Sequence, residues 1–252
     1  MIVLLGACGR LDFATTQSLD AAPETYPLAV LADHPVVYLR LDDTGGMVAS
    51  DATGLGRDGR YSVQGGTLVY GLAGALGGTD HAVSMTGDGN SGPNLVARVA
   101  LPTSVYPWAG DFTIEFFVRP DAPPPIGWKN ALFLWEDFRL SGFRTGWTIN
   151  YLPELWTDEA GGTATITSTT PLVAGAWNHI AYTKHGNNVS IYLGGTLVAE
   201  GAIDYNVPPP DADNCLGSCH GMPSSGAFDE LAIYGSALTA QQIQVHVAAA
   251  GI

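Results

Sequence analysis

Much of the chain alternates apolar and polar positions over short segments, which is the pattern of half-buried β-strands. The clearest case is residues 111–119 (DFTIEFFVR), in which Phe112, Ile114, Phe116 and Val118 fall on one face. Further runs rich in β-branched and aromatic residues are bounded by Gly, Pro, Asn or Asp. They cover residues 36–41, 81–86, 94–99, 130–135, 145–151, 163–168, 177–184, 188–193, 196–199 and 228–234. Many short strands at this spacing predict an all-β, two-sheet antiparallel sandwich.

Two segments carry helical signals instead. Residues 28–33 (LAVLAD) are predicted to form one or two turns that Pro35 ends. Residues 239–249 (TAQQIQVHVAA) begin with Thr239, and Gln242 follows three positions later, which is the spacing of a capping box. We therefore expect a short C-terminal helix that closes the domain.

Composition and charge narrow the class of function. The chain has 252 residues, of which 46% are hydrophobic and 13% are charged, enough apolar content for one large folded domain. Its formal net charge is -14, from 10 Lys and Arg against 24 Asp and Glu. Because no run of basic residues is present to neutralise phosphates, we exclude a nucleic-acid partner. The body also lacks a stretch of about 18 apolar residues, so none of its segments is expected to span a membrane.

The first residues resemble an export signal. Residues 1–8 (MIVLLGAC) end in a sequence that resembles the lipobox of bacterial lipoproteins, with Cys8 as the lipidated residue, although the apolar run is short and no basic residue precedes it. Residues 9–27 are polar and aperiodic, as in a flexible tether. The resemblance implies an exported protein held at the bacterial cell envelope only by a lipid on Cys8, and Gly9 implies the outer membrane. The alternative is a hydrophobic N-terminus that happens to contain a cysteine.

The two remaining cysteines lie close together in the sequence. Cys215 and Cys219, in the segment CLGSC, are expected to form a disulfide with each other. So short a loop would add about 2 kcal/mol of stability on the chain-entropy model. A metal site that includes the neighbouring His220 is the alternative, but zinc needs four ligands and the sequence has no second cluster of Cys and His.

Six motifs, taken in order, resemble the laminin-G-like jelly rolls of the concanavalin A-like lectin and glucanase superfamily. They are residues 26–43 (YPLAVLADHPVVYLRLDD), 51–61 (DATGLGRDGRY), 112–120 (FTIEFFVRP), 177–183 (WNHIAYT), 189–195 (VSIYLGG) and 228–243 (FDELAIYGSALTAQQI). Leu39 and Gly194 depart from the pattern, since members often have Trp and Asp there. The resemblance implies one jelly-roll domain over residues 28–252.

The superfamily includes glycoside hydrolases, whose activity requires a catalytic pair of carboxylates. The related glucanases place them on a Glu-x-Asp-x-(x)-Glu strand, which is absent here. Asp229 and Glu230 are neighbours in a predicted strand and are expected to point to opposite faces. Glu115 and His179 lie in strands expected to be adjacent, either as an acid/base couple or, as we expect, as a structural hydrogen-bonded pair. We therefore predict that the protein is not an enzyme.

Calcium is the cofactor that the resemblance implies, because jelly rolls of this superfamily often carry one ion at a sheet edge. Calcium takes six to eight oxygen ligands. By resemblance to that site, we expect Asp42, Asp51 and Asp229 to hold a structural calcium ion. Asp42 ends the first predicted strand, Asp51 begins a turn, and Asp229 lies on the last strand. The alternative is that these are solvated acids at turns.

Carbohydrate recognition needs aromatic faces beside polar groups, and four of the six tryptophans fall between positions 128 and 156. Trp135 and Trp147 lie inside β runs and are expected in the core. Trp128 and Trp156 are expected to be exposed in loops and, with Tyr151, to shape a ligand face. We therefore predict a non-catalytic, surface-anchored module that binds a glycan or polysaccharide. A protein-binding or adhesion module is the alternative, and a glycoside hydrolase is the third possibility.

Overall fold

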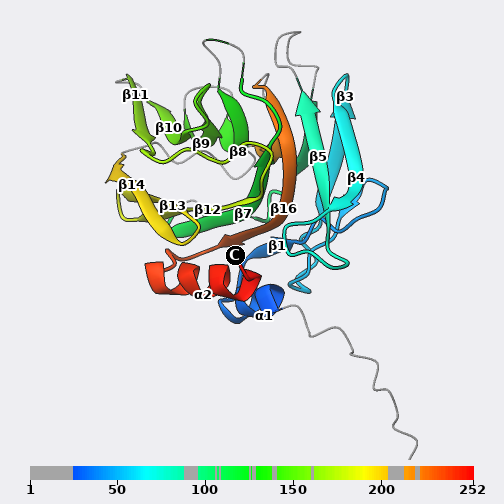
Figure 1. Ribbon diagram of the computed structural model, residues 1–252. Coiled ribbons are helices and arrows are strands. Elements are labelled where there is room, and N and C mark those ends of the chain that lie inside the picture. Colours follow the sequence, from blue (N-terminus) through cyan, green and yellow to red (C-terminus); the bar gives the residue numbers. More distant parts are fainter. Residues whose placement is uncertain are drawn as a thin grey trace, which may run out of the picture.

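A computed structural model describes residues 25–87, 96–105, 107, 109–124, 126, 129–137, 141–159, 162–203, 213–218 and 222–252. The described strands form two eight-stranded sheets that face each other, and two helices pack on one outer side of this sandwich (Figure 1). Neighbouring strands pair in the antiparallel sense. The predicted all-β, two-sheet jelly-roll sandwich with a short C-terminal helix is confirmed.

Sheet A is the sheet that the helices cover. Its strands, in the order in which they are hydrogen-bonded, are β14 (Thr196–Ala202), β13 (Asn188–Leu193), β12 (Asn178–His185), β7 (Phe112–Pro120), β16 (Ser224–Tyr234), β5 (His81–Gly87) and β4 (Thr67–Ala73). The short strand β1 (Val37–Leu39) pairs with the far part of β16.

Sheet B lies on the opposite side of the sandwich. Its strands, in order, are β11 (Gly162–Thr167), β10 (Pro153–Glu159), β9 (Ser141–Trp147), β8 (Asn130–Asp137), β15 (Asp213–Gly217), β6 (Val96–Ala100), β3 (Gly59–Gln64) and β2 (Val48–Ala49).

The main core lies between the inner faces of the two sheets. Alternation along β7 places Phe112, Ile114, Phe116 and Val118 in this core, as the sequence predicts, and all four side chains are fully buried. Sheet B contributes Trp147, the largest fully buried side chain of the described residues. Burying each Val, Leu, Ile or Phe side chain contributes about 1.5–3 kcal/mol. Because this cluster is the largest among the described residues, it contributes most of the hydrophobic stabilisation.

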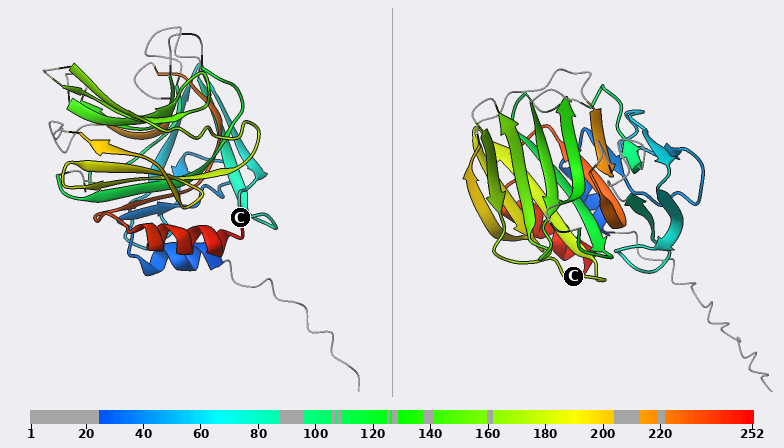
Figure 2. Two further views of the ribbon diagram at one scale, coloured as in Figure 1. Left: turned by 60° about the vertical axis from the view of Figure 1, so that its left-hand side comes forward. Right: turned by 90° about the horizontal axis from the view of Figure 1, so that it is seen from above.

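The outer face of sheet A is covered by α1 (Thr25–Ala32) and α2 (Ala240–Ala250), which pack against each other (Figure 2). Tyr26, Phe117 and Tyr234 belong to a second buried cluster under these helices, so β7 is buried on both faces. The predicted capping box of α2 is present: the Thr239 side chain accepts a hydrogen bond from the backbone of Gln242, whose side chain bonds back to Thr239. Neither helix is long and apolar enough to cross a membrane.

The outer face of sheet B points away from the helix layer. In the views of Figure 2, α1 and α2 lie beneath sheet A only, and no described helix or strand covers the far side of β8, β9 and β10. The two outer faces of the sandwich therefore differ. One is buried under helices, and no described helix or strand covers the other.

Candidate functional site

Asp51, one of the predicted calcium ligands, holds a turn of the chain. Its Oδ1 accepts hydrogen bonds from the backbone N of Tyr38 (3.2 Å) and Thr53 (3.0 Å), and its Oδ2 accepts one from the backbone N of Arg57 (3.0 Å). Burial raises the pKa of Asp51, but the hydrogen bonds outweigh burial and hold the pKa below its ordinary value. The fold itself therefore already uses this carboxylate.

Asp42, the second predicted ligand, lies in the same pocket as Asp51. This pocket, of about 270 Å³, is lined by Arg40, Leu41, Asp42, Asp43, Ser50, Asp51 and Ala52. Oδ2 of Asp42 lies 3.0 Å from Nη2 of Arg40, and its Oδ1 accepts a hydrogen bond from the backbone N of His81 at 2.7 Å. The structure thus brings Asp42 and Asp51 together, but Asp229 is not part of this pocket.

Asp229 lies instead in a cluster of three buried carboxylates. Asp80, Asp229 and Glu230 each place a carboxylate oxygen within 4.8 Å of the others, and they form the one such group found among the described residues. Asp80 is 4% exposed, and the other two are fully buried. Sequence reasoning missed Asp80 and Glu230 as members of a site, because nothing in their spacing brings them together.

The expectation that Asp229 and Glu230 point to opposite faces is wrong. The pairing of β16 with β7 shifts register between Asp229 and Ala232, which marks a β-bulge. Within this bulge Glu230 has a φ of 54°, in the left-handed region. The irregular backbone lets two consecutive side chains reach the same side of the sheet.

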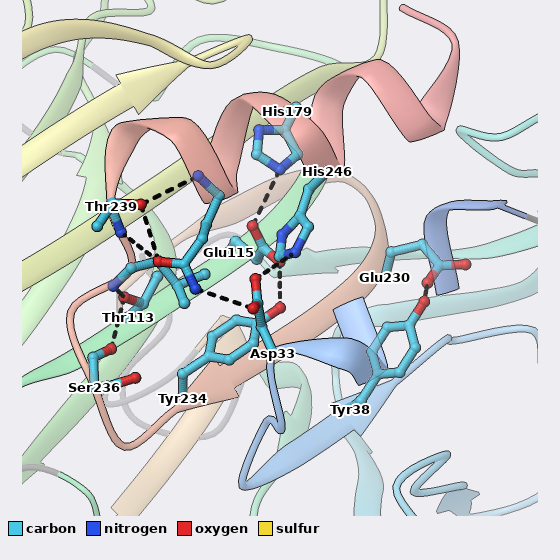
Figure 3. Close-up of polar contacts among 12 residues, drawn as sticks. Asp33, Tyr38, Thr113, Glu115, His179, Glu230, Tyr234, Ser236, Thr239 and His246 are labelled. Carbon is cyan, nitrogen blue, oxygen red and sulfur yellow. Dashed lines mark hydrogen bonds and ion pairs between the residues drawn. The ribbon is translucent and has the colours of Figure 1, made fainter. Parts of the chain in front are cut away.

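Arg40 and Tyr38 hold the carboxylate of Glu230. Nε of Arg40 lies 3.2 Å from Oε1 of Glu230, and the Tyr38 hydroxyl donates a hydrogen bond to Oε2 (Figure 3). Nη2 of Arg40 also lies 3.3 Å from Oδ1 of Asp80. Burial raises the pKa of Glu230 to about 8, in spite of these two partners.

Asp229 has fewer partners than Glu230. Its Oδ2 accepts a hydrogen bond from the backbone N of Ala75 at 2.7 Å, whereas its buried Oδ1 has no hydrogen-bond donor among the described residues. Burial raises the pKa of Asp229 well above its ordinary range, and the charges of Glu230 and Asp80 raise it further. The Arg40 guanidinium pairs with Asp80 and Glu230 and also with Asp42. The three buried carboxylates of the cluster therefore hold an excess of negative charge, which is costly unless a proton or a cation balances it.

Trp156 does not stand exposed in a loop, so that expectation is wrong. It lies in β10 and is 5% exposed. Because its neighbour Leu155 points into the core, Trp156 lies on the outer face of sheet B. Its cross-strand neighbours are Arg144 of β9 and Thr165 of β11. Gly146 lets the ring lie close to β9, since a Cβ there would be 3.0 Å from ring atoms of Trp156.

Lys129 and Glu154 form a charged pair beside Trp156. Nζ of Lys129 lies 4.5 Å from the centre of the Trp156 ring and 2.5 Å from Oε2 of Glu154. The hydroxyl of Thr167 donates a hydrogen bond to Oε1 of Glu154 at 2.8 Å. The Lys129 side chain is 32% exposed and that of Glu154 is 9% exposed. An ammonium group, a ring, a carboxylate and a hydroxyl thus meet on one sheet face, where sequence reasoning had identified only the ring.

The structure describes only some of the other aromatic residues that were predicted to bind a ligand or to lie in the core. Tyr151 is half-buried against the sandwich core, in a turn where its φ is 60°. Trp147 is fully buried, as expected. Trp128 and the side chain of Trp135 lie outside the described residues. The glycan-binding role of Trp128 therefore stays a prediction.

The cysteines are also described only in part. Cys215 is buried in β15 and is disulfide-bonded. Cys219 and Cys8 lie outside the described residues. The pairing of Cys215 with Cys219 and the lipidation of Cys8 therefore stay predictions.

Glu115 and His179 lie beneath α2, closed off from substrates (Figure 3). Nε2 of His179 lies 3.4 Å from Oε2 of Glu115. The other oxygen, Oε1, accepts a hydrogen bond from the Tyr234 hydroxyl at 2.5 Å and lies 2.9 Å from Nδ1 of His246. All four residues are at most 1% exposed. Their burial supports a structural role for the pair over that of an acid/base couple.

The sandwich and its residues define an all-β domain of the lectin type. The family model described as the concanavalin A-like lectin/glucanases superfamily (Laminin_G_3) matches residues 93–244. The chain belongs to this family. Among curated proteins, no sequence matches the chain significantly.

Solved structures share the fold at low sequence identity. Domain 4 of AbnA, an extracellular arabinanase from Geobacillus stearothermophilus, solved in complex with arabinotriose, has a TM-score of 0.64 and 21% identity, covering 84% of this chain and 98% of that one. The binding domain of botulinum neurotoxin DC, in complex with SialylT, has a TM-score of 0.66 and 12% identity, covering 86% of this chain and 51% of that one. A Trypanosoma rangeli sialidase has a TM-score of 0.59 and 14% identity, covering 84% of this chain and 32% of that one.

Proposed function

We propose that this protein is a non-catalytic carbohydrate-binding module whose ligand lies on the outer face of sheet B, across Lys129, Trp156 and Glu154. The observation that carries the proposal is the contact of the Lys129 ammonium with both the Trp156 ring and the Glu154 carboxylate. Sugars present C–H surfaces that pack on aromatic rings and hydroxyls that bond to charged groups. An arabinanase domain of the same fold, solved with arabinotriose, supports this ligand class.

The exposure of Lys129, Trp156 and Glu154 indicates which of the three side chains a sugar contacts first. Lys129 is the most exposed of the three, while Trp156 and Glu154 are almost buried. A sugar therefore meets the ammonium group first and reaches the ring as the flexible Lys129 side chain moves aside. This order makes Lys129 the residue whose replacement affects binding most and folding least.

The buried acids support the non-catalytic part of the proposal. Hydrolysis of a glycosidic bond needs a pair of carboxyl groups in contact with the sugar. Asp80, Asp229 and Glu230, which the structure brings together, are at most 4% exposed. Glu115 is fully buried under α2. A polysaccharide chain cannot reach either place while the protein is folded.

A glycan array tests the proposed function. The full chain is applied to an array that includes arabinotriose, longer arabinan fragments and sialylated oligosaccharides. We expect selective binding that the Lys129→Met variant loses. Lys184→Met is the matched control, because Lys184 also lies over an aromatic ring, 5.9 Å from the centre of Phe112, but belongs to sheet A. If neither wild type nor control binds any glycan, the carbohydrate proposal fails and a protein partner becomes the better account.

The family resemblance implies calcium, and we propose that the cluster of Asp80, Asp229 and Glu230 holds it. The residues fit a hard cation, because three carboxylates converge there and Oδ1 of Asp229 is buried without a donor. Two positive charges from the ion would offset most of the charge of the three carboxylates, which Arg40 offsets only in part because it also pairs with Asp42. Of the three calcium ligands expected from the sequence, this proposal retains Asp229 and omits Asp42 and Asp51.

Thermal unfolding with calcium and with chelator tests this site. For a dissociation constant of about 0.1 mM, 1 mM calcium adds about 1.4 kcal/mol of stability, or a few degrees in melting temperature. Asp229→Asn should abolish the calcium-dependent shift, while Asp111→Asn, a change at a half-exposed aspartate outside the cluster, should retain it. A melting temperature that calcium leaves unchanged would contradict the proposal.

Surface anchoring through a lipid on Cys8 is likewise a proposal. The described chain begins in α1, on the outer face of sheet A, and the candidate glycan face is on the opposite side of the sandwich (Figure 1). A body tethered through this end can therefore present sheet B to soluble or surface glycans. Incorporation of labelled fatty acid during bacterial expression, lost in Cys8→Ala, tests the anchor; equal labelling of both forms would refute it.

A further inference from the structure

The imidazole of His246 lies between two carboxylates that come from different layers of the fold. Nδ1 of His246 is 2.9 Å from Oε1 of Glu115 in β7, and Nε2 is 3.1 Å from Oδ2 of Asp33, the residue that follows α1 (Figure 3). The ring is 1% exposed. His246 of α2 thus connects α1, α2 and sheet A through a single side chain.

The geometry favours the positively charged form of this ring. Ionised carboxylate oxygens only accept hydrogen bonds, and a neutral imidazole carries a proton on only one nitrogen. Both nitrogens of His246 lie at ion-pair distance from carboxylate oxygens. Nδ1 has hydrogen-bond geometry toward Glu115, and Nε2 faces Asp33 as an ion pair only, so the arrangement is most favourable when both nitrogens are protonated. Loss of one proton would place a lone pair against either Glu115 or Asp33.

Other titratable groups also surround the ring. The Tyr26 ring of α1 and the Tyr234 ring of β16 lie with their centres 6.2 Å from that of His246. His179 of β12 lies on the far side of Glu115, 3.4 Å from its Oε2. Neither tyrosine changes charge near neutral pH, because burial raises the pKa of both well above the ordinary value. Glu115, Asp33 and His179 are therefore the groups that respond to the charge on His246.

Asp33 joins the two helices through a second contact to α2. Its Oδ1 accepts a hydrogen bond from the side-chain amide of Gln242 at 2.9 Å, while its Oδ2 faces His246. A pocket of about 300 Å³ between the helices is lined in part by Asp33, Gln242 and His246. Asp33, whose side chain is 24% exposed, therefore lies between solvent and the buried ring.

We propose that His246 is a proton-dependent latch, which in its doubly protonated form locks α1 and α2 onto sheet A and on losing a proton lets the helix pair loosen. The same step would weaken the attachment of the segment that enters the fold through α1. This device is independent of the proposed glycan and calcium sites, because it uses none of their residues.

The expected pH dependence follows from the contacts of the ring. Burial alone would lower the pKa of His246, but the hydrogen bond and charge of Glu115, together with Asp33, raise it above the ordinary value of 6.5. A group whose pKa is raised in the folded state contributes stability that is complete below pH 6.5 and is lost as pH rises through the folded pKa. The latch therefore holds in mildly acidic solution and releases on the alkaline side.

Hydrogen exchange of the full chain, followed by mass spectrometry between pH 5.5 and pH 9 and corrected for intrinsic exchange, tests the latch. We expect peptides of α1 and α2 to lose protection by about tenfold or more across the titration, relative to peptides of β7 and β12. His246→Gln should remove this pH step. Equal pH profiles for helices and strands in the wild type, or a step that persists in His246→Gln, would overturn the proposal.

Two further variants assign the titration to the right histidine. His185→Gln is the matched control, because His185 also contacts a carboxylate, with Nδ1 2.7 Å from Oδ2 of Asp111, but its side chain is 81% exposed. It should retain the step. His179→Gln should also retain the pH step. Loss of the step in His179→Gln, but not in His246→Gln, would overturn the assignment to His246. If His246→Gln does not fold, the ring signals of wild-type His246 in a nuclear magnetic resonance titration decide the matter: deprotonation below pH 6.5 contradicts the latch.

Discussion

The ammonium group of Lys129 lies 4.5 Å from the centre of the Trp156 ring and 2.5 Å from the carboxylate of Glu154. This contact joins the start of β8 to β10 on the sheet face that the helices leave uncovered. A cation over an aromatic ring contributes about 0.5–2 kcal/mol, depending on how well water is excluded. The same three side chains therefore serve local stability and, in our proposal, ligand recognition, and the two effects need separate measurements.

A double-mutant cycle measures the stability part. Lys129→Met leaves the nearly buried Glu154 without its cation, and Glu154→Gln leaves Lys129 over the ring without its anion. We expect each single change to lower the free energy of unfolding by about 1 kcal/mol, since Lys129 is partly screened by solvent. The double variant should cost clearly less than the sum. Urea denaturation gives these values, and strict additivity would show that the pair does not interact.

Gly146 tests how the Trp156 ring is seated. A Cβ at this position would lie 2.3 Å from the carbonyl oxygen of Asn130 and 3.0 Å from the Trp156 ring. Gly146→Ala must therefore displace β8 or the ring, and we expect a loss of about 1–3 kcal/mol by overpacking. Gly110→Ala is the control, because a Cβ there would lie 3.9 Å from the carbonyl oxygen of Pro107, an ordinary van der Waals contact. Equal melting temperatures of the two variants would contradict this packing.

Replacement of Arg40 tests how the charge of the buried carboxylates is balanced. Replacing Arg40 with Met removes the cation that faces Asp80 and Glu230, and we expect a loss of about 2–4 kcal/mol without calcium, somewhat discounted because Arg40 is 27% exposed. Calcium should then raise the melting temperature of Arg40→Met by more than it raises that of the wild type. An equal or smaller calcium shift in the variant would contradict the placement of the ion beside Arg40.

The lowered pKa of Glu115 predicts a loss of folding stability in acid. Burial raises its pKa, but contacts with His179 and His246 lower it to about 2, against an ordinary value of 4.5. A carboxyl whose pKa is depressed in the folded state contributes stability that is complete above pH 4.5 and is lost as pH falls toward 2. We expect a contribution of about 3 kcal/mol.

Urea denaturation between pH 2 and pH 5.5 checks this expectation. The wild-type free energy of unfolding should fall steeply toward pH 2, and Glu115→Gln should show a flatter profile over the same range. Acids with raised pKa values, such as Asp80, act in the opposite direction, but they are shared by both forms and cancel in the difference. Parallel profiles would contradict the role assigned to Glu115.

The sandwich could be predicted from the sequence because strand alternation and helix capping depend on residues close together in the chain. Strict alternation along 111–119 identified β7 and its core face, and the Thr239 and Gln242 spacing identified the start of α2. Strand β10 was missed, because Pro153 and acidic residues interrupt its apolar pattern, and Trp156 was placed in a loop as a result. The position of Trp156 depends on neighbours in β9 and β11, which a single sequence does not reveal.

The carboxylate cluster was predictable only in part. Asp229 was identified through the family resemblance, but Glu230 was assigned to the wrong face because strand alternation holds only where no bulge interrupts it. Asp80 reaches the cluster from the turn before β5, 149 positions away from Asp229 in the sequence. His246 was likewise missed as a partner of Glu115, since the contact depends on how α2 packs on sheet A.

Titration calorimetry of the full chain with arabinotriose, and with whichever oligosaccharide the array retains best, tests the central claim most directly. We predict saturable binding to the wild type that is weakened tenfold or more in Lys129→Met and unchanged in Lys184→Met. All three proteins should be folded at the temperature of the measurement, with the melting temperature of Lys129→Met lower by only a few degrees. Binding of the same strength to wild type and Lys129→Met would place the glycan elsewhere. Absence of binding to every glycan by the folded wild type would contradict the proposed function.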